Sequence, residues 1–517
     1  MWKPLVFILT SFTVHMSEAY RILLISQTLS KSHAILAEGL IKHLTDAGHE
    51  ITYIQTIPPE KPLPRVTVVD ISGILPRRDD FFHTKSIFEK RLNSLNLMTG
   101  FMPDILQRSR LIIEHPNIQK LIADNNQHFD VVISEFMFNT IHAGFAGLYN
   151  CPLIWFSPSN LNWMVFDLID EATNPAYSVD AVSSSTLPLT FRERVAELGL
   201  HIIKRIVVML WTTIVDNAVY EKNFAPLIRE RRNIAPSFES LAYNGSLVLS
   251  NSHPSMSGAV RAPQNFISIG GFHIDRNVKP LTEDLQKLMD DAKHGVIYFS
   301  LGSNLKSKHL PNEIKRDLLS MFGKLKQTVV WKFEEDLPER PTNVHTVPWA
   351  PQQSILAHNN CILFITHGGL LSITETIHFG VPIIGIPAFY DQYANVQRAV
   401  NMGYAKKVDL SYAMTQDLEF AIQDMLADSK YTTRAKELSE IYHDRTVPPE
   451  KELVHWVEHV IKTRGAPHLR SPAFIMPWYQ KFYLDLAFVA LVLIFILKKT
   501  LLITIGIKKT IGKQKKT

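Results

Sequence analysis

The feature that most constrains the fold is an alternation of apolar strand-like runs and helical runs, which both halves of the chain show. In the first half, residues 21–26 form an apolar run, residues 33–45 carry apolar side chains at helical spacing, and residues 49–54 begin the next run. In the second half, a predicted strand at 362–366 precedes a predicted helix at 370–379. A strand–helix–strand unit joins parallel strands. The alternation therefore predicts an α/β fold with two parallel sheets.

Length and local composition give the expected domain map. A chain of 517 residues suits two domains with extensions at the ends. Residues 158–240 are expected to be mainly helical, and residues 247–250 to form the last strand of the first half. The expected segments are a signal peptide at 1–19, an N-terminal domain at 20–253, a linker rich in Gly, Pro and Asn at 254–280, a C-terminal domain at 281–465, a transmembrane helix at 482–503 and a basic tail at 504–517.

Both ends of the chain resemble membrane-targeting segments. Residues 1–19 combine an early Lys, an apolar centre and a small-residue cleavage site, typical of a secretory signal, with a buried first strand as the alternative. Residues 486–497 are uninterrupted apolar sequence between aromatic residues and lysines, typical of a membrane helix, with a monotopic amphipathic anchor as the alternative. Lys513 and Lys515 match a dilysine retrieval pattern, for which a merely basic flank is the alternative. We expect a single-pass type I protein of the endoplasmic reticulum membrane with a lumenal body.

Charge and cysteine content exclude other classes. The formal net charge is +5, and the lysines of residues 498–517 account for it, so no nucleic acid partner is expected. Cys151 and Cys361 are too few for a disulfide-stapled secreted protein and are expected to be buried thiols. Asn244 begins an Asn-Gly-Ser sequon, a candidate glycosylation site, although such triplets also occur by chance.

Residues 366–369, Thr-His-Gly-Gly, lie where an apolar strand becomes a helix. The first N–H groups of a helix are unpaired, and glycine lets an anion approach the backbone. His367 and Gly369 are therefore candidate pyrophosphate ligands, although glycine turns of this kind are common. Other positions nearby strengthen this interpretation, each with an ordinary alternative such as a core Trp, a surface Glu or a loop Asp. They are Ser303, Trp349, Ser372, Glu375, Asp391 and Gln392.

The same residues carry a resemblance to a known family. WAPQ at 349–352, THGG at 366–369, Glu375, HFGVPIIGIP at 378–387 and DQ at 391–392 resemble the long signature of the UDP-glycosyltransferases. The resemblance covers nearly the whole chain and is strongest with arthropod members. It implies a GT-B fold of two facing Rossmann-like domains with a C-terminal transmembrane helix.

By this resemblance each signature residue contacts one part of a UDP-sugar. The implied ligands are Trp349 and Gln352 for uracil, Glu375 for ribose, His367, Ser303 and backbone near Leu371 and Ser372 for phosphate, and Asp391 and Gln392 for the sugar. Two positions depart from the family. Many relatives have Asn in place of Leu371, so a phosphate contact there must come from the backbone N–H. Lys332 stands where vertebrate relatives have Arg and offers a point charge in place of a planar fork.

The chemistry calls for a general base, because a neutral hydroxyl is a poor nucleophile. His33 lies in the first turn of a predicted helix, whose dipole disfavours imidazolium. A lone His there would ordinarily be a surface residue, but the family has its catalytic His at this place. Relatives often have an Asp after the strand at 129–134. This chain has Glu135, and Asp130 is a poorer candidate because it lies early in that strand.

The expected function is inverting transfer of a hexose from UDP-sugar to hydroxyl groups of small lipophilic acceptors, as in detoxification. The arthropod likeness favours glucose, with glucuronate as the main rival. UDP-sugar is a co-substrate, and no cofactor or metal is expected, because no His and carboxylate ligands cluster at metal-binding spacing. Expected partners are the two substrates and membrane lipid, and a homo-oligomer is left open. The acceptor pocket should lie within 80–240, with candidate lining residues, or core residues in the alternative, at Phe81, Phe82, Trp163, Met164 and Phe166.

Two other functions fit the sequence less well. One is a catalytically inactive relative that acts as an interaction protein in the endoplasmic reticulum membrane. The other is a different nucleotide-sugar enzyme on the same fold, such as an epimerase. His33, Glu375 and the pair Asp391 and Gln392 argue against the first, and the two targeting segments argue against the second.

Overall fold

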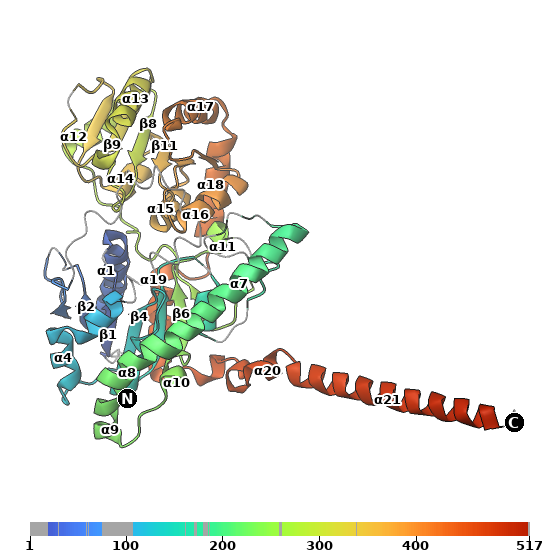
Figure 1. Cartoon of the computed structure of the whole chain (residues 1–517). Helices are drawn as coiled ribbons and strands as arrows, with labels where there is room; N and C mark the ends of the chain where they lie inside the picture. The colour runs from blue at the N-terminus through green and yellow to red at the C-terminus, as the bar shows by residue number, and fades with distance from the viewer. Residues whose placement is uncertain are drawn as a thin grey trace, which may run out of the picture. The chain divides into compact units, whose positions relative to one another are not determined.

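The computed structural model describes residues 19–514 apart from 29, 58, 60, 75–106, 161, 170–172, 179–182, 184, 186, 258–260 and 338. The chain forms two compact units, Met1–Leu469 and Arg470–Thr517. The first unit contains two parallel β-sheets with helices packed around them (Figure 1). Residues 1–18 of the expected signal peptide and residues 515–517 of the basic tail lie outside the described residues.

The first sheet has seven parallel strands in the order β3-β2-β1-β4-β5-β6-β7. The strand order reverses between β1 and β4, and ligands of open α/β sheets bind at the carboxyl ends of strands beside such a reversal. Ile25 of β1 lies opposite Ser134 of β4, so the residues that follow them meet at this point. The strands are β1 (Arg21–Ser26), β2 (Glu50–Gln55), β3 (Val66–Asp70), β4 (Val131–Glu135), β5 (Leu153–Ser157), β6 (Leu247–Ser250) and β7 (Phe266–Ser268).

The second sheet has six parallel strands in the order β10-β9-β8-β11-β12-β13. Its order reverses between β8 and β11, where Ser300 lies opposite Thr366. The loops after these two residues therefore emerge side by side. The strands are β8 (Val296–Ser300), β9 (Thr328–Lys332), β10 (Val344–Val347), β11 (Cys361–Thr366), β12 (Ile383–Gly385) and β13 (Ala405–Lys407).

Helices cover both faces of the two sheets (Figure 1). Those that follow strands of the first sheet are α1 (Lys31–Asp46), α4 (Pro116–Ala123), α5 (Ala143–Tyr149), α6 (Trp163–Asp167), α7 (Phe191–Trp211), α8 (Asn217–Asn223), α9 (Ala225–Arg232), α10 (Phe238–Ala242) and α11 (Pro254–Ser257). The later helices of this unit are α12 (Glu283–Asp290), α13 (Asn312–Gly323), α14 (Gln352–Ala357), α15 (Leu370–Phe379), α16 (Gln392–Asn401), α17 (Met414–Ala427), α18 (Lys430–His443) and α19 (Pro449–Lys462).

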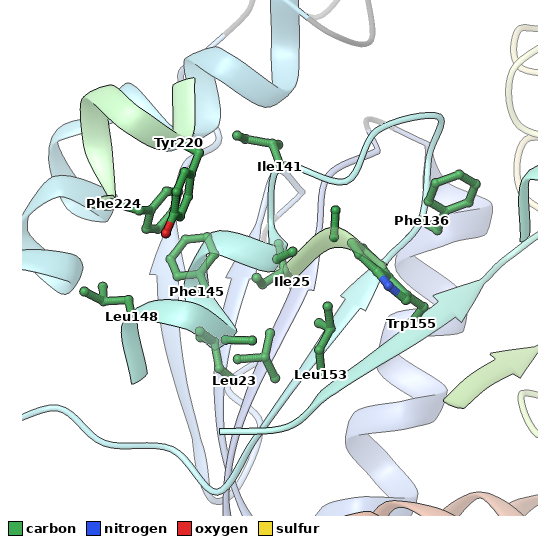
Figure 2. Packing of buried hydrophobic residues seen from close by; sticks show 14 of the residues in the cluster. Leu23, Ile25, Phe136, Ile141, Phe145, Leu148, Leu153, Trp155, Tyr220 and Phe224 are labelled. Carbon is green, nitrogen blue, oxygen red and sulfur yellow. The ribbon is translucent and has the colours of Figure 1, made fainter. Parts of the chain in front are cut away.

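Strands β1, β4, β5 and β6 of the first sheet are buried on both faces, which explains their continuous apolar runs. Leu23 and Ile25 pack into one apolar cluster, whereas Ile22 and Leu24 pack into another. Figure 2 shows the first cluster, which includes Leu23, Ile25 and the ring of Trp155. Each fully buried side chain of this kind stabilises the fold by roughly 1.5–3 kcal/mol.

The structure corrects the expected end of the first half. Residues 247–250 do form a strand, but β7 pairs with β6 and extends the sheet beyond it, so the expectation that β6 is the last strand is wrong. β7 has only three residues in a stretch rich in Gly, Pro and Asn, which masks the strand pattern. The stretch 254–280 is therefore not a plain linker, because α11 and β7 lie within it.

The last helix of the first unit also differs from the expected domain map. Residues 281–465 were expected to belong to the second domain, but α19 packs on α1 and the first sheet. Leu453, Val457 and Val460 of α19 share a buried cluster with Leu36 and Leu40 of α1. The chain therefore returns to the N-terminal half, a long-range contact that the local pattern of α19 cannot reveal.

The second unit contains α20 (Trp478–Lys481) and the long helix α21 (Leu484–Gln514). Within α21, Leu484–Ile505 is 22 residues long and apolar enough to cross a membrane. This segment matches the expected transmembrane helix at 482–503, with both ends shifted by about two residues. A second stretch that passes the same test, Phe191–Asn223, lies in the first unit.

Candidate active site

A His–Glu pair lies at the switch point of the first sheet. His33 stands in the first turn of α1, and its Nδ1 atom contacts Oε1 of Glu135, the last residue of β4. The residues are 102 positions apart and meet because β1 and β4 are neighbours in the sheet. With Nδ1 engaged by the carboxylate, Nε2 is the ring nitrogen that can accept a proton from a substrate. The side chain of His33 is 18% exposed and that of Glu135 only 4%.

The second oxygen of Glu135 is held by donors from the end of β1. Oε2 accepts hydrogen bonds from the Gln27 N–H at 3.0 Å, the Thr28 hydroxyl at 3.1 Å and the Ser26 hydroxyl at 3.3 Å. Burial alone would raise the pKa of the Glu135 carboxyl, but attraction to the protonated form of His33 and the hydrogen bonds from His33, Gln27 and Thr28 outweigh burial and lower that pKa below its usual value. The group is therefore an ionised, immobilised carboxylate that fixes the orientation of the imidazole.

Asp130 lies at the opposite end of the same strand. Its Oδ2 accepts a hydrogen bond of 2.7 Å from the Arg21 N–H, where β1 begins. It is therefore remote from His33, as its early place in the strand indicated.

The turn before α15 offers an anion site. Gly369 is the N-cap residue of α15 and caps it without a side-chain hydrogen bond, which leaves the first N–H groups of the helix for a ligand. The His367 ring packs tightly against two glycines, since a Cβ at Gly302 or at Gly369 would lie 2.5 Å from it. Gly302 has a φ of +86°, which also requires glycine. Burial first, and then the charge of Lys332, lowers the pKa of His367 to about 4, so its ring is neutral near pH 7.

Glu375, within α15, is the hub of a buried polar cluster. Its Oε2 accepts a hydrogen bond from Gln352 Nε2, and its Oε1 accepts one of 3.1 Å from Gln353 Nε2. Gln352 also donates to the Ser372 hydroxyl at 3.1 Å. His273 Nε2 lies 3.9 Å from Glu375 Oε1. Burial raises the pKa of Glu375 to about 7, and the hydrogen bonds from Gln352 and Gln353 oppose that shift.

Trp349 lies on the surface between two lysines. Its side chain is 50% exposed, Lys31 Nζ lies 3.9 Å from the ring centroid, and Lys332 Nζ lies 5.3 Å from it. Lys332 is buried and donates to the Gly302 carbonyl at 2.8 Å and to Glu334 at 2.9 Å. A cation from α1, an element of the other half, therefore lies over this exposed ring.

Asp391 and Gln392 lie at the start of α16. Asp391 Oδ2 accepts a hydrogen bond of 2.9 Å from Asn395 Nδ2. Burial raises the pKa of Asp391, and the hydrogen bond from Asn395 and the charge of a protonated His33 oppose the shift. Gln392 Oε1 accepts from the N–H groups of Ala388 and Phe389, which leaves its amide N–H₂ for a ligand.

Other contacts join the two halves beside these residues. Ser30 Oγ donates to Asn304 Oδ1 at 3.4 Å, one residue beyond Ser303, and the rings of Phe138 and Tyr390 meet edge to face at 5.5 Å. The side chain of Leu371 packs against the apolar cluster that contains α1. Because its side chain has no polar group, Leu371 can offer only its backbone N–H to phosphate.

The remaining residues, predicted for the acceptor pocket and for glycosylation, are placed less favourably for those roles. Trp163 and Phe166 are buried, and Met164 is partly buried against the apolar core of the first sheet, so these three match the alternative of core residues. Phe81 and Phe82 lie outside the described residues. Asn244 is half-buried in the turn before β6, and Ser246 of its sequon is fully buried.

Sequence reasoning missed several residues that hold the site together. The donors Ser26, Gln27 and Thr28 follow an apolar strand, and their place beside β4 could have been inferred from the strand order of a doubly wound sheet. Gln353 directly follows the predicted uracil ligand, but nothing local indicates that its amide reaches Glu375.

The two parallel sheets, each with its own switch point, form a GT-B fold, and solved structures of similar fold agree. A UDP-glucosyltransferase from Polygonum tinctorium matches with a TM-score of 0.56 at 15% identity, covering 86% of this chain and 99% of that one. The calicheamicin glycosyltransferase CalG4 matches with a TM-score of 0.53 at 16% identity, covering 87% of this chain and 100% of that one.

Sequence comparison narrows the class to a family. The family model described as UDP-glucoronosyl and UDP-glucosyl transferase matches residues 79–517, and the chain belongs to this family. UDP-glucosyltransferase 2 of Dactylopius coccus is 31% identical over 489 residues, covering 94% of this chain and 92% of the relative. The 2-hydroxyacylsphingosine 1-beta-galactosyltransferase of Rattus norvegicus is 27% identical over 502 residues, covering 94% and 88%. The expected family and the expected GT-B fold are therefore confirmed.

Proposed function

We propose that this chain transfers a hexose, glucose in preference to glucuronate, from a UDP-sugar to a hydroxyl group of a small lipophilic acceptor with inversion at the anomeric carbon. The observation that carries the proposal is the contact of His33 with the immobilised, ionised Glu135 at the switch point. The names of arthropod relatives such as UDP-glucosyltransferase 2 support glucose.

The proposed reaction is a single displacement. His33 Nε2 takes the acceptor hydroxyl proton while the acceptor oxygen forms a bond to the anomeric carbon. The bond from that carbon to the phosphate oxygen breaks, and UDP leaves with the electron pair. The N–H groups at the start of α15 stabilise the negative charge of the diphosphate, and Glu135 stabilises the imidazolium.

The other proposed ligands follow the geometry of the second half. Glu375 accepts hydrogen bonds from the ribose hydroxyls, and Trp349 stacks on uracil. Gln352 contacts uracil and donates a hydrogen bond to Glu375. His367, Ser303 and the N–H groups of Leu371 and Ser372 face the phosphates, while Asp391 and the free amide of Gln392 face the sugar. Lys332, already engaged by the Gly302 carbonyl, contributes positive charge near the phosphates.

The test is UDP release by the purified full chain with UDP-glucose or UDP-glucuronate, with and without a panel of phenols. We expect release that depends on the phenol and is faster with UDP-glucose. No release with either donor supports an inactive interaction protein. Altered sugar without a conjugate supports an epimerase. Phenol-dependent release with UDP-glucuronate alone contradicts the donor assignment only.

We also propose that α21 anchors the chain in the endoplasmic reticulum membrane, with the first unit in the lumen and the basic tail in the cytosol. The apolar segment Leu484–Ile505 and the lysines that follow it support this orientation. Protease treatment of sealed microsomes should remove only the tail. A first unit that is digested without detergent would contradict the proposed topology, and a mass shift on deglycosylation that Asn244→Gln abolishes would establish the glycan.

A further inference from the structure

Helix α7 exposes apolar side chains that a helix in water would bury. Val195, Leu198, Ile202, Ile206 and Met209 follow one another at spacings of three and four residues, and each is 48–56% exposed. A row at this spacing forms a single stripe along the helix. A water-facing helix of a globular protein turns such a stripe toward the core. The stripe of α7 is turned away from it.

The opposite side of α7 and of the π-helical turn that follows it, Thr212–Asp216, is charged and buried. Glu197 and Lys204 are the buried residues that the helix contributes, at 5% and 6% exposure, and Asp216 is 4% exposed. Asp216 accepts hydrogen bonds of 3.2 and 3.3 Å from Thr140. These buried polar contacts fix which side of the helix faces the protein.

A further ion pair supports the same orientation. Arg205 Nη2 lies 3.0 Å from Asp167 Oδ1, and the ring of Trp163 meets that of His201 edge to face at 5.3 Å. The apolar stripe therefore cannot turn inward without burying unpaired charge or breaking these contacts. The surroundings of the stripe must be something other than water.

The chemistry of the stripe favours lipid over a protein partner. Four of its five members are aliphatic (Val, Leu and Ile), whereas the centres of protein interfaces are enriched in aromatic residues, Met and Arg. Arg192 and Arg194 are exposed at the start of the helix, where lipid phosphates would lie. The same chain carries a segment apolar enough to cross a membrane, Leu484–Ile505, so a bilayer is available to it.

The same observations decide between lying on a membrane and crossing it. Although Phe191–Asn223 is apolar enough to span by composition, a spanning helix would expose the buried charges of its other face to hydrocarbon. A helix with one apolar side and one polar side lies in the plane of the interface. The 21 residues of α7 would cover about 32 Å of membrane surface at 1.5 Å per residue.

We propose that the exposed stripe of α7 is a monotopic membrane contact, inserted into the headgroup and upper acyl region of a bilayer, in addition to the C-terminal segment (Figure 1, long green helix). The contact is independent of the proposed reaction. It gives the first unit its own affinity for lipid.

The test places a fluorescent label on the stripe of the full chain in phosphatidylcholine vesicles. Ile206→Cys carries the label, and Phe420→Cys on α17, 68% exposed and equally apolar, is the matched control. The parent chain, whose Cys361 is buried and Cys151 partly buried, serves as the labelling blank. Circular dichroism and thermal unfolding check that Ile206→Cys is folded, since Ile206 is 48% exposed.

We expect nitroxide-labelled lipid to quench the label at 206 several-fold more than the label at 420, and iodide in the water to do the reverse. Equal quenching by iodide at the two positions would overturn the proposal. A label at 206 that is shielded from both iodide and nitroxide lipid would also overturn it, because a second copy of the chain would then cover the stripe.

Discussion

The two halves of the first unit build their parts of the site in different ways. In the second half, the residues proposed to bind the nucleotide and the sugar lie mostly within 349–392, on and beside helices α14, α15 and α16. In the first half, the proposed base and its carboxylate are 102 residues apart and meet only through strand pairing. A site built from adjacent loops leaves a contiguous signature, whereas a site built by topology does not. The comparison predicts that binding and chemistry can be damaged separately.

The largest loss of turnover without loss of binding should come from removing the proposed base, His33. His33→Ala should lower the turnover number by about 10²- to 10⁴-fold, because it removes general base catalysis. UDP-sugar affinity should change little, since the nucleotide contacts lie in the other half. Steady-state turnover and isothermal titration measure the two effects. His43→Ala, the same substitution further along α1, is the control, and equal losses in both variants would remove His33 from the mechanism.

Glu135→Gln tests whether the carboxylate supports the base. A neutral amide cannot stabilise the imidazolium, so turnover should fall by about 10²- to 10³-fold with the Michaelis constant for UDP-sugar unchanged. Glu135→Asp keeps the charge but shortens the side chain by one methylene, so its loss should be smaller. A Gln variant as active as the parent would show that the contact with His33 is structural only.

The second half, which is proposed to bind UDP-sugar, should show the converse, a loss of binding without a loss of turnover. Glu375→Gln should weaken UDP-sugar binding by about 10- to 100-fold, because it removes charged hydrogen bonds of about 1.5–3 kcal/mol. Turnover at saturating UDP-sugar should be nearly unchanged. Ser439→Ala, on a helix that packs behind α15, is a control that leaves the carboxylate in place. Unchanged affinity in the Gln variant would mean that Glu375 does not contact the ribose.

The raised pKa of Glu375, about 7, adds a pH dependence to the same half. Ribose hydroxyls donate to the ionised carboxylate, so affinity for UDP-sugar should rise by up to about tenfold per pH unit below 7 and level off above it. Because the folded state holds the proton more tightly than the unfolded state, the linked stability has the opposite sign and is lost as pH rises through about 7. Titration from pH 5 to 8 should show the rise in the parent and a flat profile in Glu375→Gln.

The smallest effect concerns a donor that positions Glu135. Thr28→Val keeps the shape but removes the hydroxyl that donates to Oε2 at 3.1 Å, so turnover should fall by about 3- to 10-fold. Thr56→Val is the matched control, because its hydroxyl donates to the Thr28 carbonyl and not to the carboxylate. A larger loss in the control than in Thr28→Val would indicate that the loop, and not the hydrogen bond, matters.

Much of this structure could be predicted from local sequence, and the exceptions share a cause. The helix at 370–379 and the strand at 247–250 have the predicted bounds, because their apolar runs are bordered by Gly, Pro or polar residues. The strand β7 and the packing of α19 could not be predicted, since both depend on partners far away in the sequence.

The site divides in the same way. Gln352 was predicted to contact uracil and Glu375 to contact ribose, and the two side chains form a hydrogen bond with each other. The donors Ser26, Gln27 and Thr28 were not predicted, because their partner is more than a hundred residues away. Residues 158–240 were expected to be mainly helical, but only the buried charges on one side of α7 show that its apolar side faces outward.

The most direct test of the division between the halves is a double-variant cycle of His33→Ala and Glu375→Gln. UDP-sugar affinity and turnover at saturating UDP-sugar are measured on the same preparation of each variant. Because the two side chains belong to separate polar clusters, their effects should be independent. The account predicts a double variant with the turnover of His33→Ala and the UDP-sugar affinity of Glu375→Gln. A double variant whose affinity or turnover departs from those single-variant values by more than about twofold would contradict it.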